Sequence, residues 1–172
     1  MTVSNGAGLS GSFVITLSPT LAPATTANFL TYVNSGFYNG TVFHRHSPGF
    51  VLQGGGFAGP MNPSQPVPAL KATNAPVALE VGRGLSNVRW TVAMARTNVL
   101  NSATSQFFVN LGDNAFLDTS AGGYAVFGSI TSGTDFITTA LTGPCLAYPA
   151  LQAPPDCLFV PNLTITAATQ TR

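Results

Sequence analysis

The residues most suited to carry chemistry gather in one stretch, Phe43–Phe57, which reads FHRHSPGFVLQGGGF. Arg45 stands out within it, because the 172-residue chain holds only six basic side chains. Arginine keeps its charge at any ordinary pH and is seldom buried without partners. Its place in an apolar, glycine-punctuated strand indicates that the guanidinium contacts a polar group in an apolar setting.

The composition favours one β-rich domain. Charged residues make up 6% of the chain, far below the usual share of about a quarter. Thr, Ser, Asn, Gly and Pro, which suit strands and turns better than helices, take their place. The length is sufficient for a core of its own, so we treat residues 1–172 as a single domain.

Charge and hydropathy exclude several classes of partner. A net charge of +1, with Lys71 as the sole lysine, argues against nucleic acid. No apolar run approaches the length that spans a bilayer. The first ten residues lack a signal-peptide pattern, although a mature exported domain would look the same. We expect a monomer without a cofactor, and no metal site, because both histidines are far in sequence from the cysteines.

Hydrophobic periodicity indicates many short strands and two helices. Helical spacing from Leu21 to Val33, with Pro23 near its start, predicts the first helix, and Asp135–Leu141 the second. Alternation predicts strands over Gly11–Leu17, Thr41–Phe57 with a break at Pro48-Gly49, Thr91–Ala95, Gln106–Leu111, Tyr124–Ile130 and Leu163–Ala167. Such a pattern is typical of a barrel or sandwich whose open ends are covered by helices.

Five blocks follow one another along the chain. They are FHR at 43–45 with Phe50 and QGG at 53–55, MART at 94–97, SATSQFF at 102–108, FLD at 116–118 and YAVFG at 124–128. In order and spacing, from about Gly11 to Gly133, the chain resembles the cyclophilin family of peptidyl-prolyl cis-trans isomerases, most of all the short bacterial type. The resemblance implies a mainly β fold, a closed eight-stranded antiparallel barrel capped by two α-helices, with its active site in a groove on the outer face.

The activity that the resemblance implies is rotation about the peptide bond before proline. That bond resists rotation by about 18–20 kcal/mol because the nitrogen lone pair is delocalised. In the twisted state the prolyl nitrogen recovers its lone pair, and a fixed cation in an apolar groove would stabilise it selectively. The resemblance assigns this role to Arg45. We expect no surface salt bridge there, since few acidic residues lie near it in sequence.

The resemblance also assigns the other site residues. The expected catalytic group is Arg45, Phe50, Gln53 and Gln106. The expected substrate-binding group is Val51, Met94, Ala95, Arg96, Phe108, Phe116, Leu117 and Tyr124, with Phe108 as the pocket floor. Phe116 lacks the indole N–H of many eukaryotic members, which puts cyclosporin binding in doubt.

For three further residues in or next to the first block, we expect a particular location or see a departure from the family pattern. We expect His44 to be a satisfied structural histidine and His46 to face solvent or the groove edge. Gly56 departs from the aspartate that commonly follows the paired glycines.

Cys145 and Cys157 lie twelve residues apart in a Pro-rich loop, about 144–161. Two interpretations stay open, a pair of free thiols or a disulfide. A disulfide would imply an oxidising compartment, so a periplasmic or extracytoplasmic location is the hypothesis and the cytoplasm its alternative.

Two functions compete for the same groove. The first is an active prolyl isomerase that acts on proline-containing peptides and on unfolded or folding proteins. The second is a non-catalytic module that binds proline-containing peptides. A serine hydrolase using Ser105, His44 and Asp118 is disfavoured, since no GxSxG surrounds Ser105. The glycines at 54–56 and 82–84 lack the spacing of a phosphate-binding loop.

Overall fold

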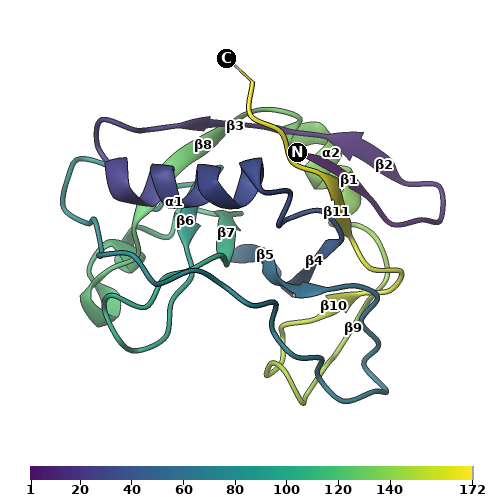
Figure 1. Cartoon of the computed structure of the whole chain (residues 1–172). Helices are drawn as coiled ribbons and strands as arrows, with labels where there is room; N and C mark the ends of the chain where they lie inside the picture. The colour runs from purple at the N-terminus through teal and green to yellow at the C-terminus, as the bar shows by residue number, and fades with distance from the viewer. Residues whose placement is uncertain (172) are drawn as a thin grey trace.

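The computed structural model describes residues 1–171, and most of its elements lie where the sequence pattern predicts them (Figure 1). The helices are α1 (Pro23–Asn34) and α2 (Thr134–Ala140), with two short 3-10 turns, η1 (Ala115–Asp118) and η2 (Ser120–Gly122). The strands are β1 (Thr2–Ser4), β2 (Ser10–Ser12), β3 (Val14–Leu17), β4 (Thr41–Ser47), β5 (Val51–Ala58), β6 (Thr91–Met94), β7 (Phe107–Asn110), β8 (Val126–Ser132), β9 (Cys145–Leu146), β10 (Leu158–Phe159) and β11 (Thr164–Ala167). Within residues 1–171, neither helix has the length and apolar character that a membrane crossing needs.

The main sheet is a closed antiparallel barrel. Its nine strands follow the order β2-β1-β11-β4-β5-β7-β6-β8-β3. Only Phe13 separates β2 from β3, so the two are halves of one run, in which β2 pairs with β1 and β3 pairs with β8. Counted as one strand, this run turns the nine-strand order into a ring of eight. The predicted eight-stranded barrel is therefore confirmed, and the segment predicted as strand Gly11–Leu17 is the one that closes it.

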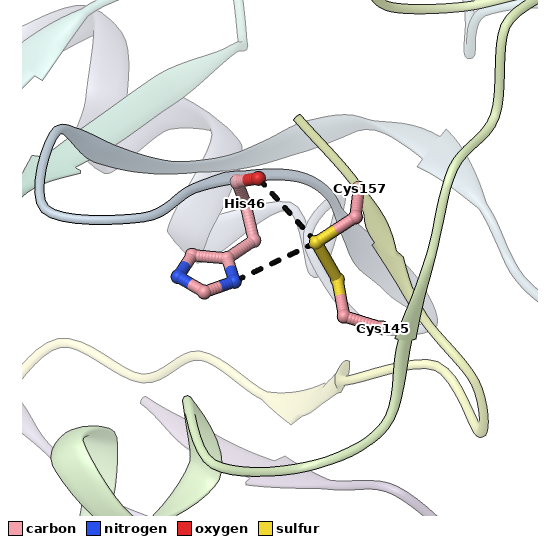
Figure 2. Close-up of side chains that lie close together, drawn as sticks. All are labelled: His46, Cys145 and Cys157. Carbon is pink, nitrogen blue, oxygen red and sulfur yellow. Dashed lines mark hydrogen bonds between the residues drawn. A yellow bond between two sulfur atoms is a disulfide. The ribbon is translucent and has the colours of Figure 1, made fainter. Parts of the chain in front are cut away.

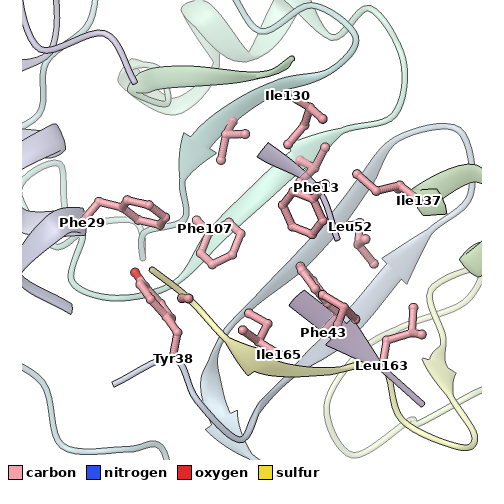
Figure 3. Packing of buried hydrophobic residues seen from close by; sticks show 14 of the residues in the cluster. Phe13, Phe29, Tyr38, Phe43, Leu52, Phe107, Ile130, Ile137, Leu163 and Ile165 are labelled. Atoms are coloured by element: carbon pink, nitrogen blue, oxygen red, sulfur yellow. The ribbon is translucent and has the colours of Figure 1, made fainter. Parts of the chain in front are cut away.

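Side chains fill the barrel interior and leave no room for a ligand there. Aromatic rings meet edge to face, as in Phe29 and Phe107, whose centroids are 5.6 Å apart at 89° (Figure 3). Both helices contribute to this core, α1 through Phe29 and Tyr32 and α2 through Ile137. A ligand site must therefore lie on the outside of the barrel.

The N-terminus of α1 is held by a residue from a distant loop. The residue at its N-cap, Ala22, has no side chain that could cap the helix. Instead the buried Glu80 carboxylate accepts hydrogen bonds from the backbone N–H of Ala24 at 3.3 Å and of Thr25 at 2.8 Å. The Thr25 hydroxyl adds a third, and Arg83 lies 3.0 Å from the other carboxylate oxygen. A carboxylate at this position satisfies free N–H groups and complements the helix dipole.

The segment after α2 departs from a plain loop. Cys145 on β9 and Cys157 form a disulfide, so of the two interpretations left open the disulfide is the one the structure contains. The segment packs outside the barrel in a small apolar cluster of Val42, Phe57, Met61, Tyr148 and Leu158. Strand β1 and the β9–β10 pair have no counterpart among the predicted strands, since runs of two or three residues are too short for alternation to show.

We predict that Glu80→Gln lowers the free energy of unfolding at pH 7 by about 1–2 kcal/mol, because an amide is a weaker acceptor for the helix N–H groups. Burial raises the pKa of Glu80, but the hydrogen bonds from Thr25 and Ala24 and the nearby Arg83 outweigh it and leave the pKa lowered from its ordinary value of 4.5. A lowered carboxyl pKa stabilises the fold above the ordinary value, and this stabilisation is lost as the pH falls through the folded-state value. Urea unfolding at several pH values measures the difference.

The control is Arg83→Gln, which removes a half-exposed partner and should change stability by less than about 0.5 kcal/mol. The difference between wild type and Glu80→Gln should shrink as the pH falls below 4.5. A difference that stays constant down to acid pH would contradict the capping role.

Candidate active site

Cross-strand pairing places the predicted chemical residues in one row on the outer face of the barrel. Arg45 on β4 pairs with Gln53 on β5, Gln53 pairs with Phe108 on β7, and Phe108 pairs with Ala93 on β6. Residues directly opposite each other in neighbouring strands share one face of a sheet. Four strands thus carry a charged group, an amide and an apolar floor side by side.

A register shift brings Arg45 to that outer face. Residues two apart on a regular strand share a face, and Phe43 is buried in the barrel core. Regular alternation would therefore point Arg45 inward. The pairing of β4 with β5 shifts between Phe43 and Arg45, as Phe43 pairs with Gly54 while Arg45 pairs with Gln53. Such a bulge re-aims a side chain.

Gly54 is required opposite this bulge. A Cβ there would lie 2.8 Å from the Phe43 ring, which is closer than side-chain carbons approach. The glycine run of the first block therefore has a packing reason.

The row opens onto a cavity of about 260 Å³ on the barrel surface. Nine residues line it, and all nine are predicted site residues: Arg45, Phe50, Val51, Gln53, Ala95, Arg96, Phe108, Leu117 and Tyr124. Gln106 is joined to it, because the Gln53 amide donates to Gln106 Oε1 at 2.9 Å. The structure thus brings the matched blocks together in space.

Two predicted site residues, Met94 and Phe116, do not line the cavity itself. Met94 is buried in the barrel core and does not line the cavity, because strand alternation puts its neighbours Ala93 and Ala95 on the outer face. Phe116 lies at the rim, 59% exposed, with its ring stacked on Phe50 at 5.9 Å between centroids. Met94 therefore does not line the groove as expected, whereas Ala95 does.

The floor and one wall of the cavity are aromatic. Phe108 is buried beneath it and meets Tyr124 edge to face, with centroids 5.9 Å apart. The Arg96 guanidinium lies 4.6 Å from the centre of the Tyr124 ring. Arg96 donates to the carbonyls of Gly123 and Ala121, so it ties the turn that carries Tyr124 to β6. Aromatic side chains thus form the floor and one wall of the cavity, and Arg96 braces that wall.

A partly buried polar network supports the Tyr124 wall from behind. The Asp118 carboxylate accepts from the Ser86 hydroxyl and from both the backbone and side-chain N–H groups of Asn87. Asn87 also donates to the Tyr124 carbonyl at 3.1 Å. Burial raises the pKa of Asp118, but these hydrogen bonds outweigh it and lower the pKa. The charged carboxylate thereby holds its neighbour Leu117 and Tyr124 at the cavity.

Arg45 has an ion-pair partner, contrary to the expectation from sequence. Its Nε donates to Asp156 Oδ2 at 2.5 Å, and its Nη1 donates to Gln53 Oε1 at 3.3 Å. The expectation counted only acids near Arg45 in sequence, whereas Asp156 is 111 residues away. Asp156 belongs to the segment closed by the Cys145–Cys157 disulfide, which brings it next to Arg45. No sequence signal connects the two residues apart from the scarcity of acids, of which the chain has five.

Both histidines beside Arg45 are buried. Burial, with a smaller contribution from Arg45, lowers the pKa of His44 to about 4, although a backbone hydrogen bond at Val42 opposes the shift. Within the described residues His44 Nδ1 has no hydrogen-bond partner, so this histidine is less satisfied than expected. Burial also lowers the pKa of His46, against the opposing charge of Asp156. At neutral pH the histidines therefore add no charge that competes with Arg45.

His46 does not face solvent or the groove, so that expectation is wrong. Its ring stacks on Phe159 at 4.9 Å, and its Nδ1 lies 3.8 Å from Cys157 Sγ (Figure 2). His46, Cys145 and Cys157 are the one group of three or more His, Cys, Asp or Glu in residues 1–171 whose potential ligand atoms all lie within 4.8 Å of one another. Both sulfurs belong to the disulfide and are not thiolates, the form that binds metals.

Gly56 has a steric explanation that the sequence did not reveal. A Cβ at this position would lie 2.7 Å from Gln106 Cδ. The Gln106 side chain therefore lies across β5 in the space that Gly56 leaves, where it reaches Gln53.

A larger cavity, of about 360 Å³, lies between α1, β3 and the end of the described chain. Its lining includes Phe13, Leu17 and Val33 but no titratable side chain. It offers no chemistry comparable to that of the groove.

Comparison with known proteins agrees with this geometry. The family model described as cyclophilin type peptidyl-prolyl cis-trans isomerase/CLD matches residues 1–144. A peptidyl-prolyl cis-trans isomerase A of Dickeya dadantii (strain 3937) is 51% identical over 127 residues, which cover 73% of this chain and 63% of that protein. The chain thus spans less than two thirds of the length of this relative.

Other bacterial relatives are similar. A peptidyl-prolyl cis-trans isomerase of Acinetobacter baylyi is 46% identical over 140 residues, 80% of this chain and 71% of the relative. Peptidyl-prolyl cis-trans isomerase B of Escherichia coli (strain K12) is 45% identical over 132 residues, 74% of this chain and 76% of the relative.

The fold comparison points the same way. A crystal structure of a Cryptosporidium parvum cyclophilin type isomerase, determined in the presence of the dipeptide Ala-Pro, superposes with a TM-score of 0.64. It is 21% identical and covers 96% of this chain and 98% of the other. The bacterial relatives all carry the name peptidyl-prolyl cis-trans isomerase. Barrel, groove and sequence together show that this chain belongs to the cyclophilin-type peptidyl-prolyl cis-trans isomerase family.

Proposed function

We propose that this chain catalyses rotation about X-Pro peptide bonds in the cavity beside Arg45, with proline-containing segments of unfolded or folding proteins as substrates. The observation that carries the proposal is the juxtaposition of a guanidinium with an aromatic pocket, Arg45 beside the floor residue Phe108. Pairing through Gln53 aligns the two, after the register shift between Phe43 and Arg45 has brought the arginine to the outer face.

The reaction makes and breaks no bond. The enzyme has to bind the twisted peptide better than either planar form. In the twisted state the prolyl nitrogen carries a localised lone pair, and Arg45 lines the cavity in which that lone pair would lie. Apolar surroundings strengthen this interaction, because they lower the effective dielectric constant.

The remaining residues orient the two partners. Phe108, Leu117 and Val51 would enclose the proline ring, so that rotation moves the acyl group on its N-terminal side. Gln53 accepts from Arg45 Nη1 and donates to Gln106, an arrangement that fixes both amides. The Gln106 amide is then available for the peptide backbone.

A binding module without turnover is the alternative, and the geometry argues against it. Peptide binding needs an apolar pocket and backbone partners but no cation aimed at the imide. Arg45 is 31% exposed at the cavity, within a chain that has few charges. A guanidinium so placed is expected for catalysis and has no evident use in simple binding.

The nature of the partners follows from the groove. We propose that the chain acts as a monomer, since the cavity is formed by one chain. Phe116 offers an exposed ring without a donor at the rim, so we propose weak cyclosporin binding at most.

We further propose an extracytoplasmic location. The Cys145–Cys157 disulfide supports it, because disulfides persist in oxidising compartments and are rare in the cytosol.

Arg45→Ala should lower kcat/KM at least about a hundredfold, because it removes the donors that meet the prolyl lone pair. Arg45→Lys should recover part of the loss, since it restores the charge without the planar fork. A protease-coupled assay of cis-to-trans rotation in a proline tetrapeptide measures both. Arg89→Ala, outside the cavity, is the control and should stay within about twofold of wild type.

Wild-type rates equal to the uncatalysed rate would sink the enzyme proposal. In that case, binding of the same peptide, measured by isothermal titration calorimetry, would favour the non-catalytic binding module.

Titration of the denatured, unreduced protein with a thiol reagent should find no free thiol, because both cysteines are bonded. The same titration after reduction should find two thiols. Two thiols before reduction, in protein purified from an oxidising compartment, would remove the support for the extracytoplasmic proposal.

A further inference from the structure

We propose that Asp156 is a positioning residue for Arg45, and that the disulfide-closed segment Cys145–Cys157 holds it in place. This proposal rests on the proposed isomerase function and adds a residue to its machinery. The segment lies beyond residue 144, where the match to the family model ends. It therefore lies outside the part of the chain that the family model matches.

Two nitrogens of the Arg45 guanidinium are held by protein groups, and the third is free to contact a substrate. Asp156 Oδ2 accepts from Nε at 2.5 Å and Gln53 Oε1 accepts from Nη1 at 3.3 Å. The guanidinium is planar, so two anchored nitrogens fix the direction of the whole fork. Within residues 1–171 Arg45 Nη2 has no hydrogen-bond acceptor, so it remains available to a substrate in the cavity.

The Asp156 backbone is held beside Arg45 by the next residue. Cys157 exchanges two backbone hydrogen bonds with His46, one of 2.8 Å and one of 2.9 Å. This bridge extends the sheet at the residue that follows Arg45. The close-up shows the His46 ring and carbonyl both directed at Cys157 Sγ, with Cys145 bonded behind it (Figure 2).

The strand bridge and the disulfide therefore act on one residue from two sides. The bridge sets the distance of Cys157 from β4, and the disulfide ties it to β9. Asp156 is consequently 11% exposed, whereas a carboxylate on a free loop would be solvated.

Two opposing effects decide whether Asp156 helps or hinders catalysis by Arg45. The carboxylate offsets part of the positive charge of Arg45, which weakens the field at the prolyl nitrogen. Against this, an arginine side chain has many rotamers, and an unanchored Arg45 would lose that conformational entropy on meeting the transition state. The contact at Nε leaves the Nη2 side free, so the direct lone-pair contact is retained. We therefore expect orientation to prevail.

Two substitutions separate orientation from charge. Asp156→Asn keeps an oxygen acceptor and removes the charge, whereas Asp156→Ala removes both. Under the proposal, Asp156→Ala lowers kcat about three- to tenfold with KM changed less than about twofold, and Asp156→Asn retains most of the activity. Asp135→Ala, at the exposed start of α2, is the matched control for loss of a carboxylate and should leave kcat unchanged.

A spectroscopic readout tests positioning without turnover. The Arg45 Nε–H signal, identified by its loss in Arg45→Lys, should exchange slowly with water in wild type, Asp156→Asn and Asp135→Ala. It should exchange fast in Asp156→Ala. Circular dichroism establishes that each variant is folded.

A separate variant tests the Cys145–Cys157 disulfide, the tether that holds Asp156. Cys145→Ser with Cys157→Ser should reproduce both effects of Asp156→Ala, and reduction of the wild-type protein by a dithiol should do the same if the double variant fails to fold.

The outcomes are distinct. Asp156→Ala with wild-type kcat, or with higher kcat, would overturn the positioning role, as would unchanged Nε–H exchange. Equal loss in Asp156→Asn and Asp156→Ala would show that charge, not orientation, matters. Tether variants with wild-type kcat and slow exchange would overturn the part played by the disulfide. Inactive wild-type protein with slow Nε–H exchange would instead count against the proposed function alone.

Discussion

The register shift between Phe43 and Arg45 is the constraint on which the rest of the site depends. Without it, strand alternation would direct a permanent charge into a core of aromatic rings, where no described group could neutralise it. With it, one strand supplies Phe43 to the core and Arg45 to the groove. The neighbouring strands need no irregularity of this kind at Gln53 and Phe108, because ordinary pairing aligns them with the re-aimed arginine.

Because the chain has few charged residues, each ionised group has a large share in the electrostatics of the protein. Asp118 and Glu80 are carboxylates whose hydrogen bonds outweigh burial and hold parts of the fold in place, one at the groove wall and one at α1. The two histidines next to Arg45 are neutral, for reasons of burial. The charges at the groove are therefore those of Arg45, Asp156, the anchored Arg96 and, behind the wall, Asp118. A field produced by so few groups is determined by their orientation more than by their number.

The sequence motifs predicted the residues that line the groove better than the residue that holds Arg45 in place, Asp156. Arg45, Gln53 and Phe108 were found because each sits in a short block whose neighbours are local in sequence. Met94 was placed in the groove because its block was matched without applying alternation, which puts Ala93 and Ala95 outside and Met94 inside. Asp156 could not be found in this way, because its pairing with Arg45 spans 111 residues and arises from a segment with no helical or strand periodicity.

The barrel was predictable in class and strand number for a different reason. Period-two patterns mark most of its strands, and the run Gly11–Leu17 was visible as one strand although it pairs on two sides. What the pattern does not contain is the order of pairing, since β1 and β11 meet across almost the whole chain.

That pairing gives the ring an order of assembly during synthesis. Strands β4, β5, β7, β6 and β8 lie between residues 41 and 132, and they can pair as soon as this part of the chain has left the ribosome. The ring cannot close until β11, at residues 164–167, has emerged to join β1 to β4. Asp156 and Cys157 also emerge late, only a few residues before β11. The wall that carries Arg45 therefore exists before its ion-pair partner, and the growing chain passes through a stage with an assembled groove and an unanchored arginine.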